Sequence, residues 1–296
     1  MTEIAPELLA HVQGGITSLC RAWDITRADG EVMGFTDHDQ TLTFDDISYR
    51  ADTGLSAMAL QQTTGLSVDN TEALGALRDS AIREEDIEAG RYDNAEIRAW
   101  LVNWSDVSER HLLFRGTIGE MRRANGAFEA ELRGLTQVLN LPIGRVYQKP
   151  CSAVLGDTRC RFDLDEPGFF ESRSADQIEN RRVFRFEGLA GYADNWFQHG
   201  RLIVQSGAAK GLSGMIKRDR QDEDTRVIEL WHPIRAGLVP GDTLRIEAGC
   251  DKRFPTCRHK FDNLLNFQGF PDIPGDDWSI IDPSRTGSAT GGSRRS

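Results

Sequence analysis

Hydrophobic and polar positions alternate along much of the chain, and this period of two predicts β-strands. Ile97, Ala99 and Leu101 illustrate it, since every second residue of a strand faces the same side of a sheet. Glycine, aspartate and asparagine mark turns between the alternating stretches. Strands are predicted over 16–26, 32–36, 41–49, 95–104, 111–122 and 127–132, and again over 182–186, 200–205, 215–220, 225–230 and 243–246. Antiparallel sheets with one packed face account for this pattern.

Helical spacing is confined to a few segments. Leu8, Leu9 and Val12 follow Pro6 at helical spacing and precede two glycines, so a helix is predicted at the start of the chain. A second helix is predicted over 67–90, and a short one over 136–141. The acidic second helix has Ile82 and Ile87 as apolar anchors and Gly90 as its end. The fold class is therefore mainly β, a β-rich α+β protein.

Breaks in the pattern divide the chain into three parts. The 296 residues, 39% of them hydrophobic, exceed what one core usually organises. Pro142, Gly144 and Pro150 interrupt regular structure, which indicates a domain boundary between residues 149 and 150. Serine, threonine, glycine and arginine dominate the end of the chain. We predict domains over 1–149 and 150–275 and a flexible tail over 276–296.

Charge and apolar content limit the function. The net charge is −11, and an acidic chain is poorly suited to wrapping DNA, although DNA can slide past such a surface. No apolar run reaches the roughly 20 residues that span a bilayer, and the N-terminus lacks the pattern of a secretory signal. We therefore expect folding in the cytoplasm, where thiols stay reduced.

Four of the five cysteines stand in two pairs. Eight residues separate Cys151 from Cys160, six separate Cys250 from Cys257, and 89 residues lie between the pairs. Structural zinc usually takes pairs with two to four intervening residues, so zinc fits imperfectly. An iron-sulfur cluster also takes four thiolates and accepts wider loops. A disulfide interpretation requires oxidation, and ordinary buried thiols are the remaining alternative.

The residues around the second pair favour a negatively charged centre. Basic side chains that offset thiolate charge, and phenylalanines that exclude water, are concentrated there. A solvated basic face with core phenylalanines would account for the same residues without the cysteines. The candidates next to the cysteines are Lys252, Arg253, Phe254, Arg258, Lys260 and Phe261.

No catalytic constellation was identified. The run from Asp37 to Asp39 includes His38, but polar residues in a turn usually serve local hydrogen bonds. Cys20 lies in a predicted strand and is interpreted as a packed thiol. The glycine-rich stretch 207–214 lacks the residue order of a phosphate-binding loop. We expect a non-enzymatic protein.

The segment from Gly249 to Gly275, GCDKRFPTCRHKFDNLLNFQGFPDIPG, together with the gap between Cys151 and Cys160, resembles a conserved family of phage tail-module proteins. That family includes the tail hubs of the gene transfer agents of alphaproteobacteria. Both cysteine gaps also resemble those of tail-tip proteins of lambda-like phages, in which four cysteines hold a [4Fe-4S] cluster. Stretches 34–39 and 83–92 extend the resemblance toward the N-terminus.

The resemblance implies a β-rich hub domain over 1–149 and an iron-sulfur domain over 150–275. It implies that Cys151, Cys160, Cys250 and Cys257 bind the cluster, with zinc as the alternative. It also implies a homotrimer in the virion baseplate that joins the distal tail protein to tip and fibre proteins and surrounds the DNA exit path. A cytoplasmic iron-sulfur enzyme or electron carrier is the alternative function. An acidic lumen would keep DNA from adhering to the wall.

Overall fold

The structure is a computed structural model that describes residues 4–51, 55–57, 70–71, 75–77, 82–124, 127–134 and 144–273. Contacts between residues divide the chain into unit 1, residues 1–143, and unit 2, residues 144–296. The sequence placed the boundary six residues later, at 149/150. The predicted helix over 136–141 and the predicted tail over 276–296 lie outside the described residues. The described helices include none that is long and apolar enough to cross a membrane.

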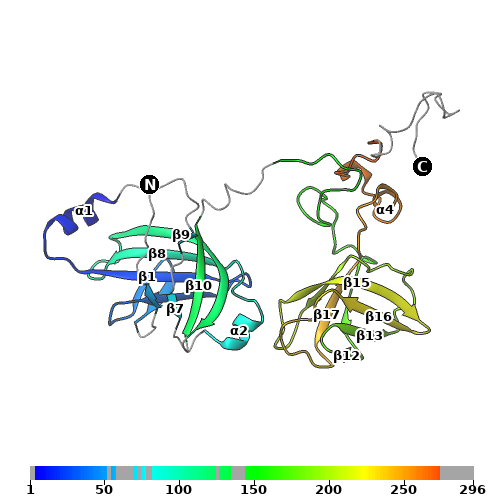
Figure 1. The fold of residues 1–296 in the computed structure, drawn as a ribbon, viewed down its shortest axis with the longest axis horizontal. Coiled ribbons are helices and arrows are strands. Elements are labelled where there is room, and N and C mark those ends of the chain that lie inside the picture. Colours follow the sequence, from blue (N-terminus) through cyan, green and yellow to red (C-terminus); the bar gives the residue numbers. More distant parts are fainter. Residues whose placement is uncertain are drawn as a thin grey trace. The chain divides into compact units, whose positions relative to one another are not determined.

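Unit 1 is built on a mainly antiparallel sheet (Figure 1) with the strand order β3-β4-β2-β1-β8-β9-β10-β7-β5 and with β6 paired to β10. Its helices are α1 (Pro6–Gln13) and α2 (Glu84–Glu88). Its strands are β1 (Leu19–Thr26), β2 (Val32–Thr36), β3 (Leu42–Phe44), β4 (Ile47–Arg50), β5 (Leu55–Ala57), β6 (Asn70–Thr71), β7 (Gly75–Leu77), β8 (Glu96–Asn103), β9 (Arg110–Ala124) and β10 (Ala127–Gly134). The alternating pattern thus correctly predicted the antiparallel architecture.

Two apolar clusters form the core of unit 1. One includes Trp23, Ile25 and Phe35, and the other includes Tyr49 and Cys20. Cys20 is buried, its thiol donates to the Val102 carbonyl at 3.6 Å, and burial raises the pKa of that thiol to about 11. The prediction that Cys20 is a packed thiol is confirmed.

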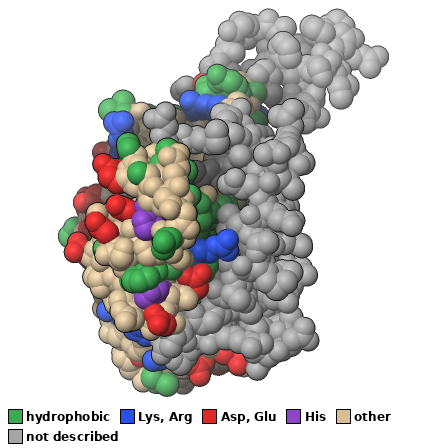
Figure 2. Space-filling view, turned by 90° about the vertical axis from the view of Figure 1, so that its left-hand side faces the viewer, with side chains coloured by type: hydrophobic (Ala, Val, Ile, Leu, Met, Phe, Trp, Pro, Cys, Tyr) green, Lys and Arg blue, Asp and Glu red, His purple; other side chains and the backbone are tan. Residues whose placement is uncertain are grey.

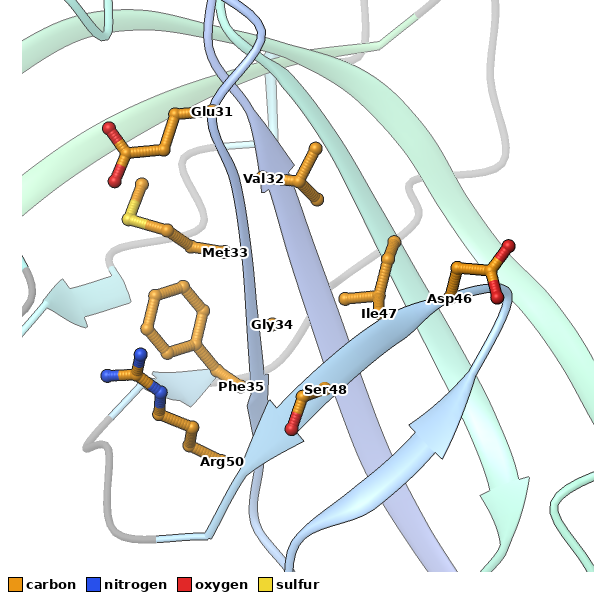
Figure 3. A pocket seen from close by; sticks show the side chains of 9 residues that line it. All are labelled: Glu31, Val32, Met33, Gly34, Phe35, Asp46, Ile47, Ser48 and Arg50. Atoms are coloured by element: carbon orange, nitrogen blue, oxygen red, sulfur yellow. The ribbon is translucent and has the colours of Figure 1, made fainter.

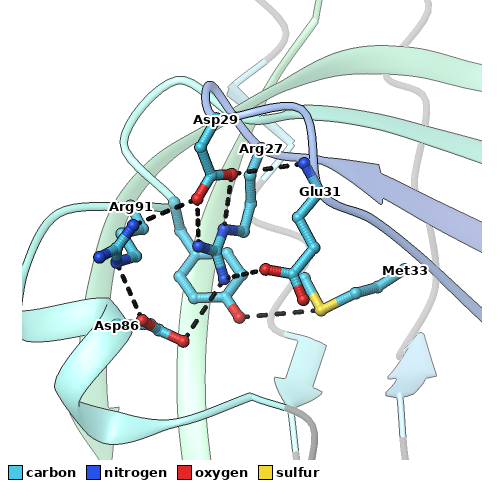
Figure 4. Close-up of polar contacts among 7 residues, drawn as sticks. Arg27, Asp29, Glu31, Met33, Asp86 and Arg91 are labelled. Carbon is cyan, nitrogen blue, oxygen red and sulfur yellow. Dashed lines mark hydrogen bonds and ion pairs between the residues drawn. The ribbon is translucent and has the colours of Figure 1, made fainter. Parts of the chain in front are cut away.

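Helix α2 is attached to the β1–β2 turn by ion pairs (Figure 4). The buried Arg27 guanidinium lies 2.8 Å from Glu31 and 3.4 Å from Asp86 and also contacts Asp29, and Arg91 lies 3.0 Å from Asp86. Burial alone would raise the pKa of Asp29, but its hydrogen bonds and the neighbouring arginine charges lower it overall. The network ties the helix to the sheet.

Two predicted elements of unit 1 were wrong. The described residues of the helix predicted over 67–90 include only one helix, α2, while β6 and β7 lie in the same segment. Its C-terminal anchors were correct: Ile82 is buried, Ile87 packs on the core, and Gly90 has a left-handed φ of 74°. The strand predicted over 41–49 is a hairpin, β3 and β4, since Asp45 and Asp46 turn with φ of 51° and 59°.

Unit 2 has a seven-stranded antiparallel sheet in the order β11-β17-β14-β15-β16-β13-β12. Its elements are β11 (Phe170–Ser174), β12 (Gln177–Glu179), β13 (Val183–Glu187), β14 (Arg201–Val204), β15 (Ser213–Asp222), β16 (Thr225–Leu230), β17 (Thr243–Glu247), α4 (Phe254–His259) and the 3-10 turn η1 (Leu264–Asn266). The five strands predicted there are all present. Strands β11 and β12, whose residues alternate weakly, were not predicted.

The core of unit 2 encloses an ion pair among its apolar residues, which include Phe184, Phe186 and Phe197. Arg226 and Asp219 are both fully buried, with Nε and Oδ1 2.6 Å apart. Arg226 also donates to backbone carbonyls of the 189–193 loop. The pair therefore fastens that loop onto β15 and β16.

Charges are mixed on the visible surface. Figure 2 shows a face on which acidic, basic and hydrophobic side chains are interspersed. The exposed apolar side chains of unit 1 include Leu9 and Val12 of α1 and Ile16, which is 90% exposed. The helix predicted at the start of the chain is confirmed as α1. Only Leu8 of α1 is buried, and much of its apolar surface is exposed to solvent.

Candidate metal centre

All four paired cysteines line one cavity in unit 2. Cys151 and Cys160 lie in the loop before β11, Cys250 follows the end of β17, and Cys257 lies in α4. The lining residues are Cys151, Ala153, Leu155, Cys160, Cys250, Lys252, Arg253, Cys257, Phe261, Asn263, Asn266 and Phe267. The fold thus brings together two cysteine pairs that 89 residues separate in the sequence.

Hydrogen bonds shape the loop of the first pair. The Asp157 carboxylate accepts backbone N–H groups from Cys160 at 2.7 Å and from Val154 and Arg159 at 2.9 Å each. The hydrogen bonds from Cys160 and Val154 are the main cause that lowers the pKa of Asp157 below its usual value. Asp157 thereby folds the loop between Cys151 and Cys160 back on itself.

The second pair is placed by a close approach of two backbones. Gly249 donates its N–H to the Trp196 carbonyl at 3.0 Å. A Cβ on Gly249 would lie 1.7 Å from the Gln198 carbonyl oxygen, so only glycine fits there. Helix α4 then begins with Phe254 and Pro255, as a helix with proline in its first turn does, and it carries Cys257 inward.

Three cysteine sulfur atoms accept hydrogen bonds from nitrogen. The donors are the Lys252 N–H to Cys250, the Gln268 N–H to Cys151 and the Asn263 side-chain amide to Cys160, each at 3.4 Å. The Cys257 thiol donates to the Asn263 carbonyl at 3.3 Å. Neutral sulfur is a weak acceptor, whereas such donors stabilise a negatively charged sulfur.

Burial opposes free thiolates in this cavity. It raises the pKa of Cys250, and it raises the pKa of Cys257 to about 11, with the nearby cysteines adding to the shift. For Cys250 and Cys257, a bound cation would offset this cost and favour the thiolate. The donor set therefore suits a positively charged metal group.

The predicted neighbours of the cysteines occupy different positions. Lys252, Arg253 and Phe261 line the cavity. Phe254 reaches it through Phe267, with an edge-to-face contact at 5.4 Å. Arg258, at the end of α4, is exposed and is not among the lining residues.

Lys260 supports the loops rather than lining the cavity. Its ammonium donates to the carbonyls of Trp196 and, at 2.8 Å, Gly249, and it lies 4.3 Å from the centroid of the Trp196 ring. Burial lowers the pKa of Lys260 to about 8. It thus joins the segment before Cys250 to the 196–200 loop.

Several residues of the site were not predicted. Asp157, Asn263, Asn266 and Gln268 contact the cysteine loops, but no spacing rule singles them out, whereas Phe267 is one of the phenylalanines expected to exclude water. Asn263, Asn266 and Gln268 lie in the stretch that follows the second pair, so proximity to Cys257 is the signal that was available.

The arrangement differs from that of a single-ion site. A tetrahedral zinc with bonds of about 2.3 Å needs sulfur atoms about 3.8 Å apart. Among the described residues, no group of three or more His, Cys, Asp or Glu side chains is arranged to hold one metal ion. The cavity volume is ≈ 20 Å³, the space of about one water molecule.

A second cavity, of ≈ 300 Å³, lies in unit 1 beside the parallel contact of β2 with β4 (Figure 3). Gly34 is required there, because a Cβ would lie 2.7 Å from the Ser48 carbonyl oxygen. The lining residues are Glu31, Val32, Met33, Gly34, Phe35, Asp46, Ile47, Ser48 and Arg50. None of these is a cysteine or histidine, the residues that most often bind zinc.

The run 37–39 forms local bonds, as expected of a turn. Asp37 accepts the Arg21 N–H at 2.7 Å, and His38 accepts the Gln40 N–H at 3.0 Å. His38 also stacks near Trp104, with ring centroids 5.0 Å apart. These contacts account for the run without a catalytic role.

Comparison with known proteins places the chain in a class. Residues 5–163 match the N-terminal attachment domain of baseplate hub proteins, and residues 195–277 match the phage conserved hypothetical protein family BR0599. The first match covers more than half of the chain, so the protein belongs to the baseplate hub family. No curated protein matches the chain.

A solved structure narrows the comparison further. A chain from the virion of a native gene transfer agent particle is 53% identical, with a TM-score of 0.88, and the match covers 98% of this chain and 99% of that one. The protein is accordingly a structural hub of the tail or baseplate of a phage-like particle, and its location is the virion. The resemblance to the tail hubs of gene transfer agents is confirmed.

Proposed function

We propose that the cavity of unit 2 holds a [4Fe-4S] cluster, bound by Cys151, Cys160, Cys250 and Cys257, and that this cluster has a structural role in the hub. One observation carries the proposal: four cysteines from two distant loops converge on one cavity. The four thiolates supply all the protein ligands that such a cluster takes, so no position stays open for a substrate.

The gaps of eight and six residues within the cysteine pairs favour a cluster over zinc. Each thiolate of a cluster binds a different iron, so the sulfur atoms are spread more widely than around one ion. Hydrogen bonds from nitrogen to three of the sulfurs offset the negative charge. Phe261 and Phe267 line the cavity and exclude water. The cluster exceeds the ≈ 20 Å³ of the cavity, so the lining residues would have to move apart to admit it.

Cluster binding would stabilise unit 2 by joining distant loops. The 89-residue segment between the pairs includes the strands β11 to β17. Closing this segment removes conformational entropy from the unfolded chain, and ligand binding adds to folding free energy. Loss of one ligand is therefore expected to impair folding or assembly.

Within the particle, we propose that the hub forms a trimer, joins the distal tail protein to tip and fibre proteins, and surrounds the DNA exit path. The family membership and the net charge of −11 support this role. An acidic wall would repel DNA phosphates and let DNA pass. Channel-facing residues that are mostly lysine and arginine in an assembled tail would rule this out.

Anaerobic purification tests the cluster directly. Iron and acid-labile sulfide in equal amounts, with a broad absorbance band in the blue region, are expected. A colourless protein with one zinc per chain would refute the cluster.

The Cys250→Ser variant tests the structural role. We expect particles that assemble poorly or transfer little DNA, because unit 2 loses its closure. Normal assembly and DNA transfer by cluster-free Cys250→Ser particles would show that the cluster is dispensable.

A further inference from the structure

Two residues connect the first cysteine pair to the second. The backbone of Lys252 accepts the Cys151 N–H at 2.8 Å and donates its own N–H to the Cys250 sulfur at 3.4 Å. Asn263 makes the corresponding connection between Cys160 and Cys257. Each connection joins one cysteine of the first pair to one of the second.

Asn263 makes its connection with both side chain and backbone. The side-chain amide donates to the Cys160 carbonyl at 2.7 Å and to the Cys160 sulfur at 3.4 Å. The Asn263 backbone N–H donates to the Cys257 carbonyl at 3.0 Å, and its carbonyl accepts the Cys257 thiol at 3.3 Å. Of these contacts to the cysteines, only those to Cys160 depend on the side chain.

The orientation of the Asn263 amide is set by a further bond. The Asn266 side chain donates to the Asn263 Oδ1 at 2.7 Å. The oxygen is thereby directed to Asn266, and the NH₂ group is directed to Cys160. An aspartate at position 263 would keep the shape and the acceptor but lose both bonds to Cys160.

We propose that Asn263 is a positioning residue that sets the register of Cys160 against Cys257 before metal binds. Where the cluster of the proposed function is present, the same amide stabilises negative charge on the Cys160 sulfur. That second part rests on the proposed function. The first part concerns the chain alone.

Iron-free protein tests the first part. The Asn263→Ala variant and the wild type are treated with iodoacetamide, and alkylation of each cysteine is followed by mass spectrometry. Loss of the two hydrogen bonds to Cys160 should speed alkylation of Cys160 about 5- to 30-fold. Cys151 should react at the wild-type rate, because Lys252 still holds it. Leu265→Ala, which removes a 99% exposed side chain from the adjacent turn, is the matched control.

Unchanged alkylation of Cys160 would overturn the proposal. An equal increase at all the paired cysteines would also overturn it, since that result indicates general unfolding. The Asn263→Asp variant is a control for loss of packing, because aspartate has nearly the same side-chain volume as asparagine. In this variant, hydrogen exchange at the Cys160 loop should rise as it does in Asn263→Ala.

Iron-loaded protein tests the second part. Asn263→Ala should lose iron to a chelator about 10- to 100-fold faster than wild type, and its reduction potential should fall because a donor to sulfur is gone. A purely structural role would leave the potential unchanged, and an unchanged potential would refute this part. Absence of iron and sulfide from the wild type would refute the proposed cluster instead, while alkylation would still decide the role of Asn263.

Discussion

Replacement of Arg226 by methionine should destabilise unit 2 strongly. Arg226 Nε and Nη2 donate to both oxygens of Asp219, at 2.6 and 2.8 Å. Its guanidinium also donates to the carbonyls of Leu189, Tyr192 and Ala193, at 3.3, 3.0 and 2.6 Å. The variant therefore leaves a buried carboxylate without its cation and removes a donor from three carbonyls, of which only that of Ala193 keeps another, the Trp196 N–H at 3.2 Å, among the bonds described.

The expected cost follows from the burial of the pair. Arg226 and Asp219 are both 0% exposed, and the Phe197 N–H, at 2.8 Å, would be the donor remaining to Asp219. Removing one partner of a buried pair costs about 3–5 kcal/mol. For a unit of this size, each kcal/mol lowers Tm by about 2–4 °C, so unit 2 should unfold about 6–20 °C lower.

Urea denaturation with hydrogen exchange and mass spectrometry measures this cost unit by unit. Peptides from β15 and β16 should show the shift in Arg226→Met, while peptides from β1 and β8 of unit 1 serve as an internal control. The double variant Asp219→Leu/Arg226→Met should recover much of the loss, because an apolar pair avoids a buried unpaired charge. A loss below about 1 kcal/mol, or a double variant no more stable than Arg226→Met, would refute the reasoning.

Two further changes test the loops and the ion pairs. Gly249→Ala places a Cβ 1.7 Å from the Gln198 carbonyl oxygen and should displace Cys250, so bound iron and the stability of unit 2 should both fall. Gly191→Ala is the control, because nothing lies within 4 Å of its Cβ. Equal iron contents in the two variants would contradict the steric argument. The pKa of Asp29 is lower in the folded protein than in the unfolded chain, where it is near 3.9. The ionised carboxylate therefore stabilises unit 1 at pH values above the unfolded pKa, and this stabilisation is lost as the pH falls through the folded pKa. Acid titration of unit 1 unfolding should therefore be less steep in Asp29→Asn than in wild type, and identical titrations would show that Asp29 is not responsible.

The strands were predictable where alternation was strong. Residues 182–186, predicted as a strand, overlap β13, and residues 243–246 lie in β17; buried positions alternate along most of both strands. The helix predicted over 67–90 was wrong where β7 forms. The local pattern there is compatible with a helix, but β7 gains hydrogen bonds by pairing with β10. Sheet pairing is a long-range interaction that a local pattern does not report.

The site was predictable only in part. The cysteines were found by their spacing, and Lys252, Arg253 and Phe261 by their proximity in sequence. Asp157 was missed, because its role depends on the three backbone N–H groups that the folded loop turns toward it. Arg258 was included because of its charge, but the turn of α4 leaves it exposed.

Local chemistry in the sequence was enough to determine the mainly β class, the two cysteine pairs and the hub resemblance, because alternation, thiol spacing and motif are properties of neighbouring residues. Only the tertiary structure decided that the two pairs meet at one cavity. That meeting depends on β17 ending beside the 196–200 loop, on the glycine at position 249 that allows the close approach, and on Asn263 joining Cys160 to Cys257. Contacts between residues about 50 to 100 positions apart arise from packing of the whole unit, which no short stretch of sequence encodes.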